Sequence, residues 1–281
     1  MSDFAIARAI YRIRQTFRYA YPAPIHDLEH RLIVAPPFVY GDQRLIVDDL
    51  TIGTPIAISW HDDDFGNRIA ILDAARIELA VELNYEATVE RIAGDAPHVP
   101  ARLLEDARYR QPSELTFPST LMREVAASIM GVDDGIYARA LRINDFVAAH
   151  MRYAPDATSV LTTAAEAFAL AAGVCQDYAH IMVSLARACG FAARYVSGHL
   201  IGEGGTHAWV EILAPASDPT CAVVWAFDPT HARRTNLDYV FIAAGRDFTD
   251  VTPTSGRFVA PFVGEFTTSR SVDRLSIEYA A

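Results

Sequence analysis

Alternating apolar and polar positions dominate the first ninety residues of the chain. Bulky apolar side chains occupy odd positions between 11 and 21, and the same two-residue period extends over 77–89 with polar residues in between. This period predicts half-buried strands, each with one packed and one solvated face. Shorter strands are expected at 44–50 and 55–60, followed by a turn at 62–67. The pattern predicts a β-sandwich.

The periodicity changes beyond residue 94, where three prolines up to position 112 indicate a connector. After the connector, helical spacing predicts helices over 119–130 and 136–151. The later part returns to strands, expected at 192–200, 207–213, 222–228, 239–244 and 275–279. The sequence therefore predicts an α+β fold. Its parts are a β-rich N-terminal domain at 1–95, a connector at 96–115 and a second domain at 116–281.

Composition and charge narrow the class of partner. The chain has 281 residues, of which 51% are hydrophobic and 21% charged, which is typical of a globular protein with one large core or two modest ones. Its formal net charge is −11, and all 24 basic residues are arginine. An acidic surface disfavours binding to nucleic acid or to an anionic membrane. We therefore expect neither as a partner.

The location of the protein is predicted from its first twenty residues, its apolar stretches and its cysteines. Four arginines interrupt the first twenty residues, so no secretory signal is recognised. The longest apolar stretches are shorter than the ~20 residues that cross a bilayer. Three cysteines, an odd number without a CxxC pair, fit a reducing cytoplasm better than a disulfide framework or a zinc site. We expect a soluble cytoplasmic protein without metal or cofactor.

Cys175 is the strongest candidate for chemistry. It stands at the start of a predicted helix that ends at Gly190. A thiol at a helix N-terminus meets free backbone N–H groups and the positive end of the helix dipole, which favour the nucleophilic thiolate. The same N–H groups could stabilise the oxyanion of an acyl-transfer intermediate. The alternative is a buried thiol of the core, the commoner role of cysteine.

A base and its orienting group follow on two predicted strands. His207 begins one strand and Asp228 ends the next, with the turn-forming segment 214–219 between them. If the strands form an antiparallel hairpin centred at 217.5, the two residues lie roughly opposite each other, with β-carbons ~5 Å apart. A carboxylate at that distance can orient an imidazole. The spacing predicts a Cys175–His207–Asp228 triad.

Other reactive residue types have simpler interpretations. His199 precedes a glycine-rich segment and His231 follows Asp228, and both are weaker candidates for contact with substrate. Core packing, a passive thiol or helix capping explains the others, which are Cys189, Cys221, His180, Trp209, Trp225 and Asp177.

Several short segments around the candidate residues resemble the bacterial transglutaminase-like proteins of the papain-related cysteine superfamily. The resemblance rests on GVCQDYAH at 173–180, ARYVSG at 193–198, HAWVE at 207–211, FDPT at 227–230 and GRDFTDV at 245–251. The segments YRIRQTFRY at 11–19 and DFGN at 64–67 are similar to the β-rich domain that precedes this core in many members. The resemblance implies a helix bearing Cys175 packed on an antiparallel sheet that bears His207 and Asp228. It makes Cys175 the nucleophile, His207 the general base and acid, and Asp228 its orienter.

The resemblance implies a mechanism more firmly than a substrate. A thiolate attacks an amide or ester carbonyl, and the acceptor that resolves the acyl-enzyme decides the reaction. We expect a peptidase or amidase that cleaves an amide or isopeptide bond in a peptide, protein or small amide. No Asp-x-Asp-x-Asp-Gly calcium loop occurs, which disfavours calcium-dependent cross-linking. Amine transfer, acyl transfer from coenzyme A and a non-catalytic peptide-binding module remain as alternatives.

Overall fold

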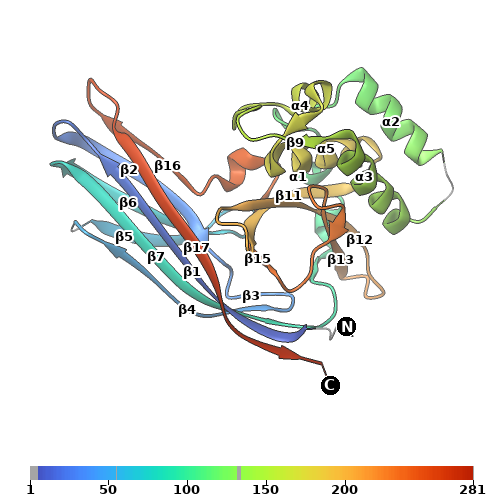
Figure 1. Cartoon of the computed structure of the whole chain (residues 1–281), viewed down its shortest axis with the longest axis horizontal. Helices are drawn as coiled ribbons and strands as arrows, with labels where there is room; N and C mark the ends of the chain where they lie inside the picture. Colours follow the sequence, from blue (N-terminus) through green and yellow to red (C-terminus); the bar gives the residue numbers. More distant parts are fainter. Residues whose placement is uncertain (1–5, 55, 132–133, 281) are drawn as a thin grey trace.

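A β-sandwich and a helix-covered antiparallel sheet lie side by side in the computed structural model (Figure 1). The structure describes residues 6–54, 56–131 and 134–280. The predicted α+β class is confirmed. Within the described ranges, no helix combines the length and apolar character that crossing a membrane requires.

The sandwich consists of two antiparallel sheets. One sheet of the sandwich has the order β17-β1-β7-β4-β3, and the other has the order β16-β2-β6-β5. Alternation along β1 buries Tyr11, Ile13 and Phe17, as the two-residue period predicts. The sandwich strands from the N-terminal part of the chain are β1 Ile6–Ala20, β2 Ile25–Ala35, β3 Val39–Tyr40, β4 Gln43–Ile52, β5 Ala57–Asp62, β6 Arg68–Ile77 and β7 Ala80–Ile92.

The end of the chain returns to this sandwich. Strand β16 (Thr254–Val259) pairs with β2, and β17 (Glu265–Tyr279) pairs with β1 along nearly its whole length. The strand expected at 275–279 is thus the end of a 15-residue strand. The expected second domain, 116–281, includes these residues, but the sequence leaves open with which domain the strand pairs, because local periodicity does not reveal a partner strand. Two distant segments of the chain therefore build one sandwich.

The sheet of the second domain, called the second sheet below, lies outside the sandwich and carries the candidate chemistry. Its order is β14-β13-β12-β11-β15, and β8 adds to β13. Helix α5 (Cys175–Ala188) packs on β11 and β12 and contacts α2, α3 and α4 on its other sides. The sheet strands are β8 His98–Pro100, β11 Ala192–Leu200, β12 His207–Pro215, β13 Cys221–Asp228, β14 Arg233–Arg234 and β15 Tyr239–Gly245. The helices are α1 Ala107–Arg110, α2 Thr120–Met130, α3 Ile136–His150 and α4 Ala164–Leu170, with short 3₁₀ turns η1 Ala101–Leu104 and η2 Phe248–Val251.

The boundaries of these helices follow local capping chemistry. Ser119 accepts a hydrogen bond from the Met122 N–H and so begins α2 where the Pro118-Ser119 pair predicts it. Thr163 and Glu166 form a capping box at the start of α4. The short parallel pair β9 (Arg152–Tyr153) and β10 (Ala172–Gly173) then leads into α5. The cap of α4 and the β9–β10 pair thus fix the path of the backbone that leads to Cys175.

Two side-chain amides join the sandwich to edge strand β15. Gln43 donates to the Phe241 carbonyl and accepts from the Phe241 N–H, both at 2.8 Å. Asn67 makes the same pair of bonds with Ala244, at 2.9 and 2.8 Å. Both amides are buried. They satisfy backbone groups that an edge strand otherwise leaves open, so they fix β15 against the sandwich.

Candidate active site

Cys175 is the first residue of α5, where the sequence places it. The Asp177 carboxylate, in the first turn, accepts hydrogen bonds from the Val174 N–H at 2.8 Å and from the Thr158 hydroxyl at 2.6 Å. A β-carbon at Gly173 would overlap this carboxylate, so the glycine allows the close approach. Burial raises the pKa of Asp177 despite these bonds. Asp177 thus has the structural role expected of it, and it fixes the turn that presents the Cys175 thiol.

His207 and Asp228 meet at the end of the hairpin between β12 and β13. The His207 Nε2 atom lies 2.8 Å from Asp228 Oδ2, and both side chains are buried. The predicted register is wrong by two residues, because Val210 rather than Ala208 lies opposite Phe227. Asp228 is therefore diagonal to His207. A diagonal neighbour is still within reach of a long side chain, so the contact forms despite the shift.

Asp228 is held by several groups besides His207. The Tyr239 hydroxyl donates to Oδ2 at 2.6 Å, and His231 Nδ1 lies 2.8 Å from the same oxygen. The Thr230 N–H donates to Oδ1 at 2.9 Å. Burial raises the pKa of Asp228, but the hydrogen bonds from His207, Tyr239 and His231 outweigh it and hold the pKa well below its usual range. Asp228 is therefore ionised throughout the neutral pH range.

The imidazole of His207 is charged across the neutral range. Burial lowers its pKa, but the hydrogen bond to Asp228 and the contact with Cys175 raise it to about 10. Because Nε2 bonds to Asp228, only Nδ1 is left to face the thiol. The structure thus brings Cys175, His207 and Asp228 together in one place, and their catalytic role stays a prediction. An imidazolium beside a thiol favours the thiolate.

Three residues of this site were not predicted from the sequence: Tyr239, which donates to Asp228, and also Glu203 and Tyr153. The Glu203 carboxylate, from the loop between β11 and β12, lies 3.0 Å from His207 Nδ1 and 3.0 Å from His231 Nε2. Tyr153 on β9 is near both the thiol and this carboxylate: burial raises the Tyr153 pKa, and Cys175 and Glu203 add to the rise. A glycine-rich loop directly before His207 was the signal for Glu203. Tyr153 had no local signal.

His231, one of the weaker candidates, contacts Asp228, and its side chain is 34% exposed, so its contact with substrate stays a prediction. His199, the other weaker candidate for substrate contact, is buried and faces Gly205 through Nδ1 at 3.3 Å. Its other nitrogen lies 3.5 Å from the Gln15 amide of β1. His199 therefore supports the loop that carries Glu203.

The remaining candidates have packing roles. Cys189 is buried, and burial raises its pKa to about 11. Cys221 is a free, half-buried thiol. Trp209 packs edge-on against Tyr239, with ring centroids 5.5 Å apart, and Trp225 packs against Tyr137 in the same way at 5.2 Å.

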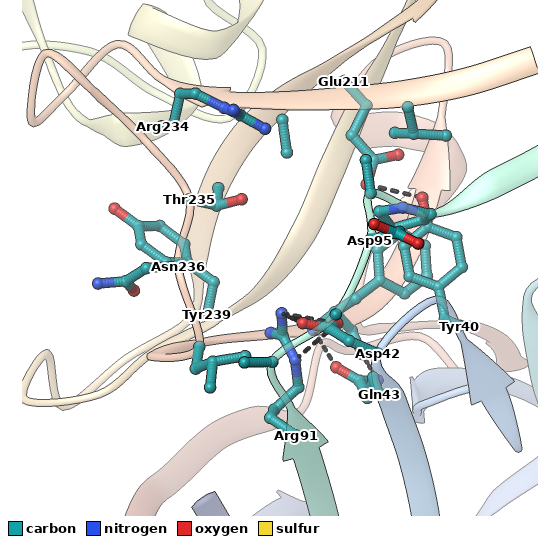
Figure 2. Close-up of a pocket in the computed structure, with 18 of the residues that line it drawn as sticks. Tyr40, Asp42, Gln43, Arg91, Asp95, Glu211, Arg234, Thr235, Asn236 and Tyr239 are labelled. Atoms are coloured by element: carbon teal, nitrogen blue, oxygen red, sulfur yellow. Dashed lines mark hydrogen bonds and ion pairs between the residues drawn. The ribbon is translucent and has the colours of Figure 1, made fainter. Parts of the chain in front are cut away.

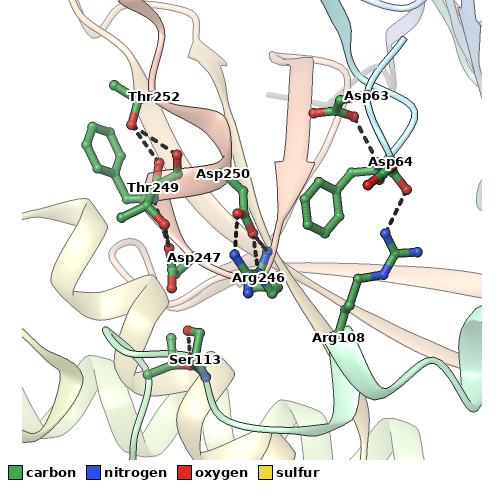
Figure 3. A network of polar contacts seen from close by, with 12 residues as sticks. Asp63, Asp64, Arg108, Ser113, Arg246, Asp247, Thr249, Asp250 and Thr252 are labelled. Atoms are coloured by element: carbon green, nitrogen blue, oxygen red, sulfur yellow. Dashed lines mark hydrogen bonds and ion pairs between the residues drawn. The ribbon is translucent and has the colours of Figure 1, made fainter. Parts of the chain in front are cut away.

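His180 belongs to a polar network at the end of β15. Its Nε2 accepts a hydrogen bond from the Phe248 N–H at 3.1 Å, which ties η2 to α5. Figure 3 shows how Arg246 and Asp250 pair and how Asp247 caps this turn. The block 245–251 therefore has a structural role.

A cavity of about 290 Å³ lies between the sandwich and the second sheet (Figure 2). Tyr40, Asp42 and Arg91 line it from the sandwich side, and Glu211, Arg234 and Tyr239 from the sheet. Cys175, His207 and Asp228 are not among its lining residues. It meets the site only through Trp209 and Tyr239, so it is not the place where the thiol acts.

One group of side chains in the described part of the chain has the composition of a metal site. His207, Asp228 and His231 present ligand atoms within 4.8 Å of one another. The Asp228 Oδ2 atom, however, already lies at hydrogen-bond distance from both imidazoles. A cation could enter only by replacing these bonds, so the geometry favours an orienting carboxylate over a metal centre.

Comparison with known families matches two regions of the chain. The model of the transglutaminase-like superfamily matches residues 123–219, and that of the bacterial transglutaminase-like N-terminal region matches residues 11–90. The first match includes Cys175 and His207 and ends before Asp228. The two regions correspond to the helical core and to the sandwich.

Individual relatives match either over a shorter part of the chain or at lower sequence identity. An uncharacterized protein of Mycobacterium leprae is 34% identical over 114 residues, which are 37% of this chain and 38% of that protein. An uncharacterized protein of Mycobacterium tuberculosis is 34% identical over 115 residues, 37% of this chain and 36% of its own length. The match thus spans little more than a third of these relatives. A crystal structure of a candidate cysteine protease from Cytophaga hutchinsonii superposes with a TM-score of 0.78 at 22% identity, covering 97% of this chain and 93% of that one. At this identity the likeness shows the fold.

Proposed function

The chain belongs to the transglutaminase-like superfamily and, on that premise, we propose that it is an acyl-transfer enzyme that hydrolyses amide or isopeptide bonds with Cys175 as nucleophile. The family and the fold support a cysteine-based enzyme in general. The observation that carries the finer proposal is the buried His207–Asp228 pair beside the first residue of α5.

The residues present suffice for both halves of such a reaction. The Cys175 thiolate attacks the carbonyl carbon, and the His207 Nδ1–H protonates the leaving nitrogen as the C–N bond breaks. The neutral imidazole then takes a proton from water, which attacks the thioester and releases the acid. Asp228 holds the imidazole in one orientation throughout.

The oxyanion of the tetrahedral intermediate needs hydrogen-bond donors. The Cys175 N–H lies in the first turn of α5, where amides have no partner within the helix. Tyr195 on β11 is near the thiol: burial raises its pKa far above the usual range, and Cys175 and Asp177 add to the rise. Its hydroxyl therefore stays protonated. We propose the backbone N–H as the main donor.

Two finer expectations are also proposals. The substrate is a peptide, a protein or a small amide, because a buried charge pair next to a helix N-terminus serves any acyl carbonyl equally. The location is the cytoplasm, in keeping with three free cysteines. An amine acceptor in place of water, or binding without turnover, is the alternative that experiment distinguishes.

Trapping of the acyl-enzyme tests this function. The protein is mixed with p-nitrophenyl acetate, quenched in acid and digested, and the acetylated peptide is identified by mass. We expect acetyl on Cys175 and release of nitrophenolate, with loss of both in Cys175→Ala and strong slowing in His207→Ala.

Matched cysteine variants serve as the control. Cys189→Ala and Cys221→Ala should retain acetylation, because both thiols lie away from His207. Equal labelling of all three cysteines, or labelling that survives in Cys175→Ala, would contradict a single activated nucleophile.

A further inference from the structure

We propose that Glu203 is a specificity-determining residue that selects substrates with a cationic group on the leaving-group side of the scissile bond. This inference rests on the proposed function, since it concerns the same thiol and imidazole. It starts from the position of one carboxylate that the triad does not use. Glu203 is 42% exposed, and its ion-pair partners among the described residues are the imidazoles of His207 and His231.

The carboxylate lies on the side of the site where the leaving group must be. His207 Nε2 is bonded to Asp228, so the proton for the leaving nitrogen comes from Nδ1. Glu203 Oε2 is 3.0 Å from this Nδ1. The Nδ1 atom nevertheless has no hydrogen-bond partner among the described residues, which means that the carboxylate is outside the bonding direction of the ring. Nδ1 faces the Cys175 thiol, where the leaving nitrogen of a bound substrate must lie, and Glu203 is beside this proton donor.

The loop that carries Glu203 is held from both domains. The Gly205 carbonyl lies 3.3 Å from His199 Nδ1, and the other nitrogen of His199 faces Gln15 of the sandwich. The Ile201 N–H donates to the Asp238 carbonyl at 3.0 Å, and the Glu203 N–H to the Leu200 carbonyl at 3.2 Å. These contacts fix the backbone on both sides of Glu203. The carboxylate thus has a defined place at the rim of the site.

The charge balance at this rim is negative. The Cys175 thiolate and the His207 imidazolium compensate each other. Arg233 donates to the Tyr239 hydroxyl at 2.9 Å, and this hydroxyl donates to Asp228, so the Asp228 network also contains a cation. Glu203 therefore contributes a negative charge next to the leaving nitrogen, half-exposed and able to attract a cation. Electrostatic complementarity of this kind changes the relative rates of substrates more than it changes the fold.

Capture of the acyl-enzyme by amines tests the inference without knowledge of the natural acyl group. In this reaction the amine nitrogen attacks the thioester carbonyl, the C–S bond breaks, and the amine proton passes to His207 Nδ1. By microscopic reversibility the amine occupies the leaving-group side. The acetyl-enzyme formed from p-nitrophenyl acetate is offered equal amounts of argininamide, citrullinamide and glutamic acid α-amide. The ratio of acetylated products is measured by mass. Because the chain contains no lysine, its own side chains do not compete as acceptors.

We expect acetyl-argininamide to exceed acetyl-citrullinamide by three- to tenfold. The ratio should approach one in Glu203→Gln and should turn toward glutamic acid α-amide in Glu203→Arg. Glu265→Gln, which removes an exposed carboxylate at the start of β17, should leave the ratio as it is. An acetyl-enzyme whose product ratio is the same with and without Glu203 would overturn this inference and leave the acyl-transfer function standing. Failure to form an adduct on Cys175 would instead overturn the proposed function, and this inference with it.

Discussion

At the scale of single residues, one carboxylate oxygen organises the site. Asp228 Oδ2 is within hydrogen-bond distance of His207, His231 and Tyr239. Each of these bonds favours the anion, and the anion favours a charged His207. In the proposed mechanism, the reactivity of the Cys175 thiol therefore depends on groups that act on it through His207. This dependence leads to three predictions at the residue scale.

Alkylation should single out Cys175. We expect iodoacetamide to modify Cys175 fast below pH 7, because the neighbouring imidazolium favours the thiolate. Cys189 should react last, because burial raises its pKa to about 11. Peptide mass after timed quenching gives each rate. His207→Ala should slow Cys175 alone, and equal rates for the parent and this variant would show that no ion pair forms.

Turnover should fall at high pH. The pKa of His207 is raised to about 10, so the imidazolium that protonates the leaving group is present below that pH and lost above it. A plot of kcat/KM against pH should therefore decline through about pH 10. A decline near pH 6.5, the ordinary value for histidine, would mean that Asp228 does not support the charge.

Tyr239→Phe should weaken the hold on Asp228 without loss of the fold. The substitution removes a hydrogen bond to a buried anion, worth about 1.5 kcal/mol, which corresponds to about a tenfold fall in kcat/KM. Tyr279→Phe, on the exposed end of β17, is the control and should keep the parent kcat/KM. A Tyr239→Phe protein with the kcat/KM of the parent would rule out the link between Tyr239 and Asp228.

At the scale of elements, strand β15 depends on side chains from another domain. It lies at one edge of the second sheet, and it precedes the turn η2 that His180 ties to α5. Gln43 and Asn67 serve it as substitutes for a neighbouring strand. The position of α5, and so of Cys175, therefore depends in part on two amides of the sandwich.

Removal of either amide should destabilise the protein. Gln43→Leu leaves the N–H and C=O of Phe241 buried without their partner, which costs about 1–3 kcal/mol. Urea unfolding should show this as a lower midpoint. Gln111→Ala, which removes an exposed amide of the connector, should change the midpoint little. A Gln43→Leu protein as stable as the parent would show that β15 needs no support from the sandwich.

At the scale of the whole molecule, the sandwich and the sheet depend on each other through buried polar contacts. Arg194 donates to Glu211 at 2.7 Å and to the Tyr40 hydroxyl at 2.5 Å, and this group crosses the interface. His199 adds a contact across the interface, with Gln15. Burial lowers the pKa of three buried histidines, His30, His180 and His199, to about 4 in each case. They lie in the sandwich, in α5 and in β11.

These histidines make stability sensitive to acid. A histidine whose pKa is lowered on folding binds a proton more tightly when unfolded, so its contribution is complete above about pH 6.5 and is lost as the pH falls toward 4. We expect the free energy of unfolding, from urea titrations, to fall between pH 7.5 and pH 4.5.

His30→Gln isolates one contribution. His30 is remote from Cys175 and contacts the Thr254 hydroxyl at 2.8 Å. The variant should be less stable than the parent at pH 7.5 but should lose less on acidification. A fall as steep as that of the parent would assign the acid sensitivity to other groups.

The sequence by itself determined the elements and the reactive types. Odd-position apolar residues fixed β1 and β7, capping residues fixed α2, and the position of Cys175 at the start of α5 followed from local pattern. Local interactions decide these features, so they are readable from neighbouring residues.

Tertiary structure decided what local pattern does not encode. The return of β16 and β17 to the sandwich depends on pairing between residues more than two hundred positions apart. The two-residue shift in pairing of the β12–β13 hairpin depends on packing along the whole ladder. Glu203, Tyr239 and His231 join the site because a loop, an edge strand and a turn converge on Asp228 and His207. The candidate residues could be named from the sequence because they are particular residue types at particular chain positions, whereas their surroundings are set by contacts that form only when distant segments pack together.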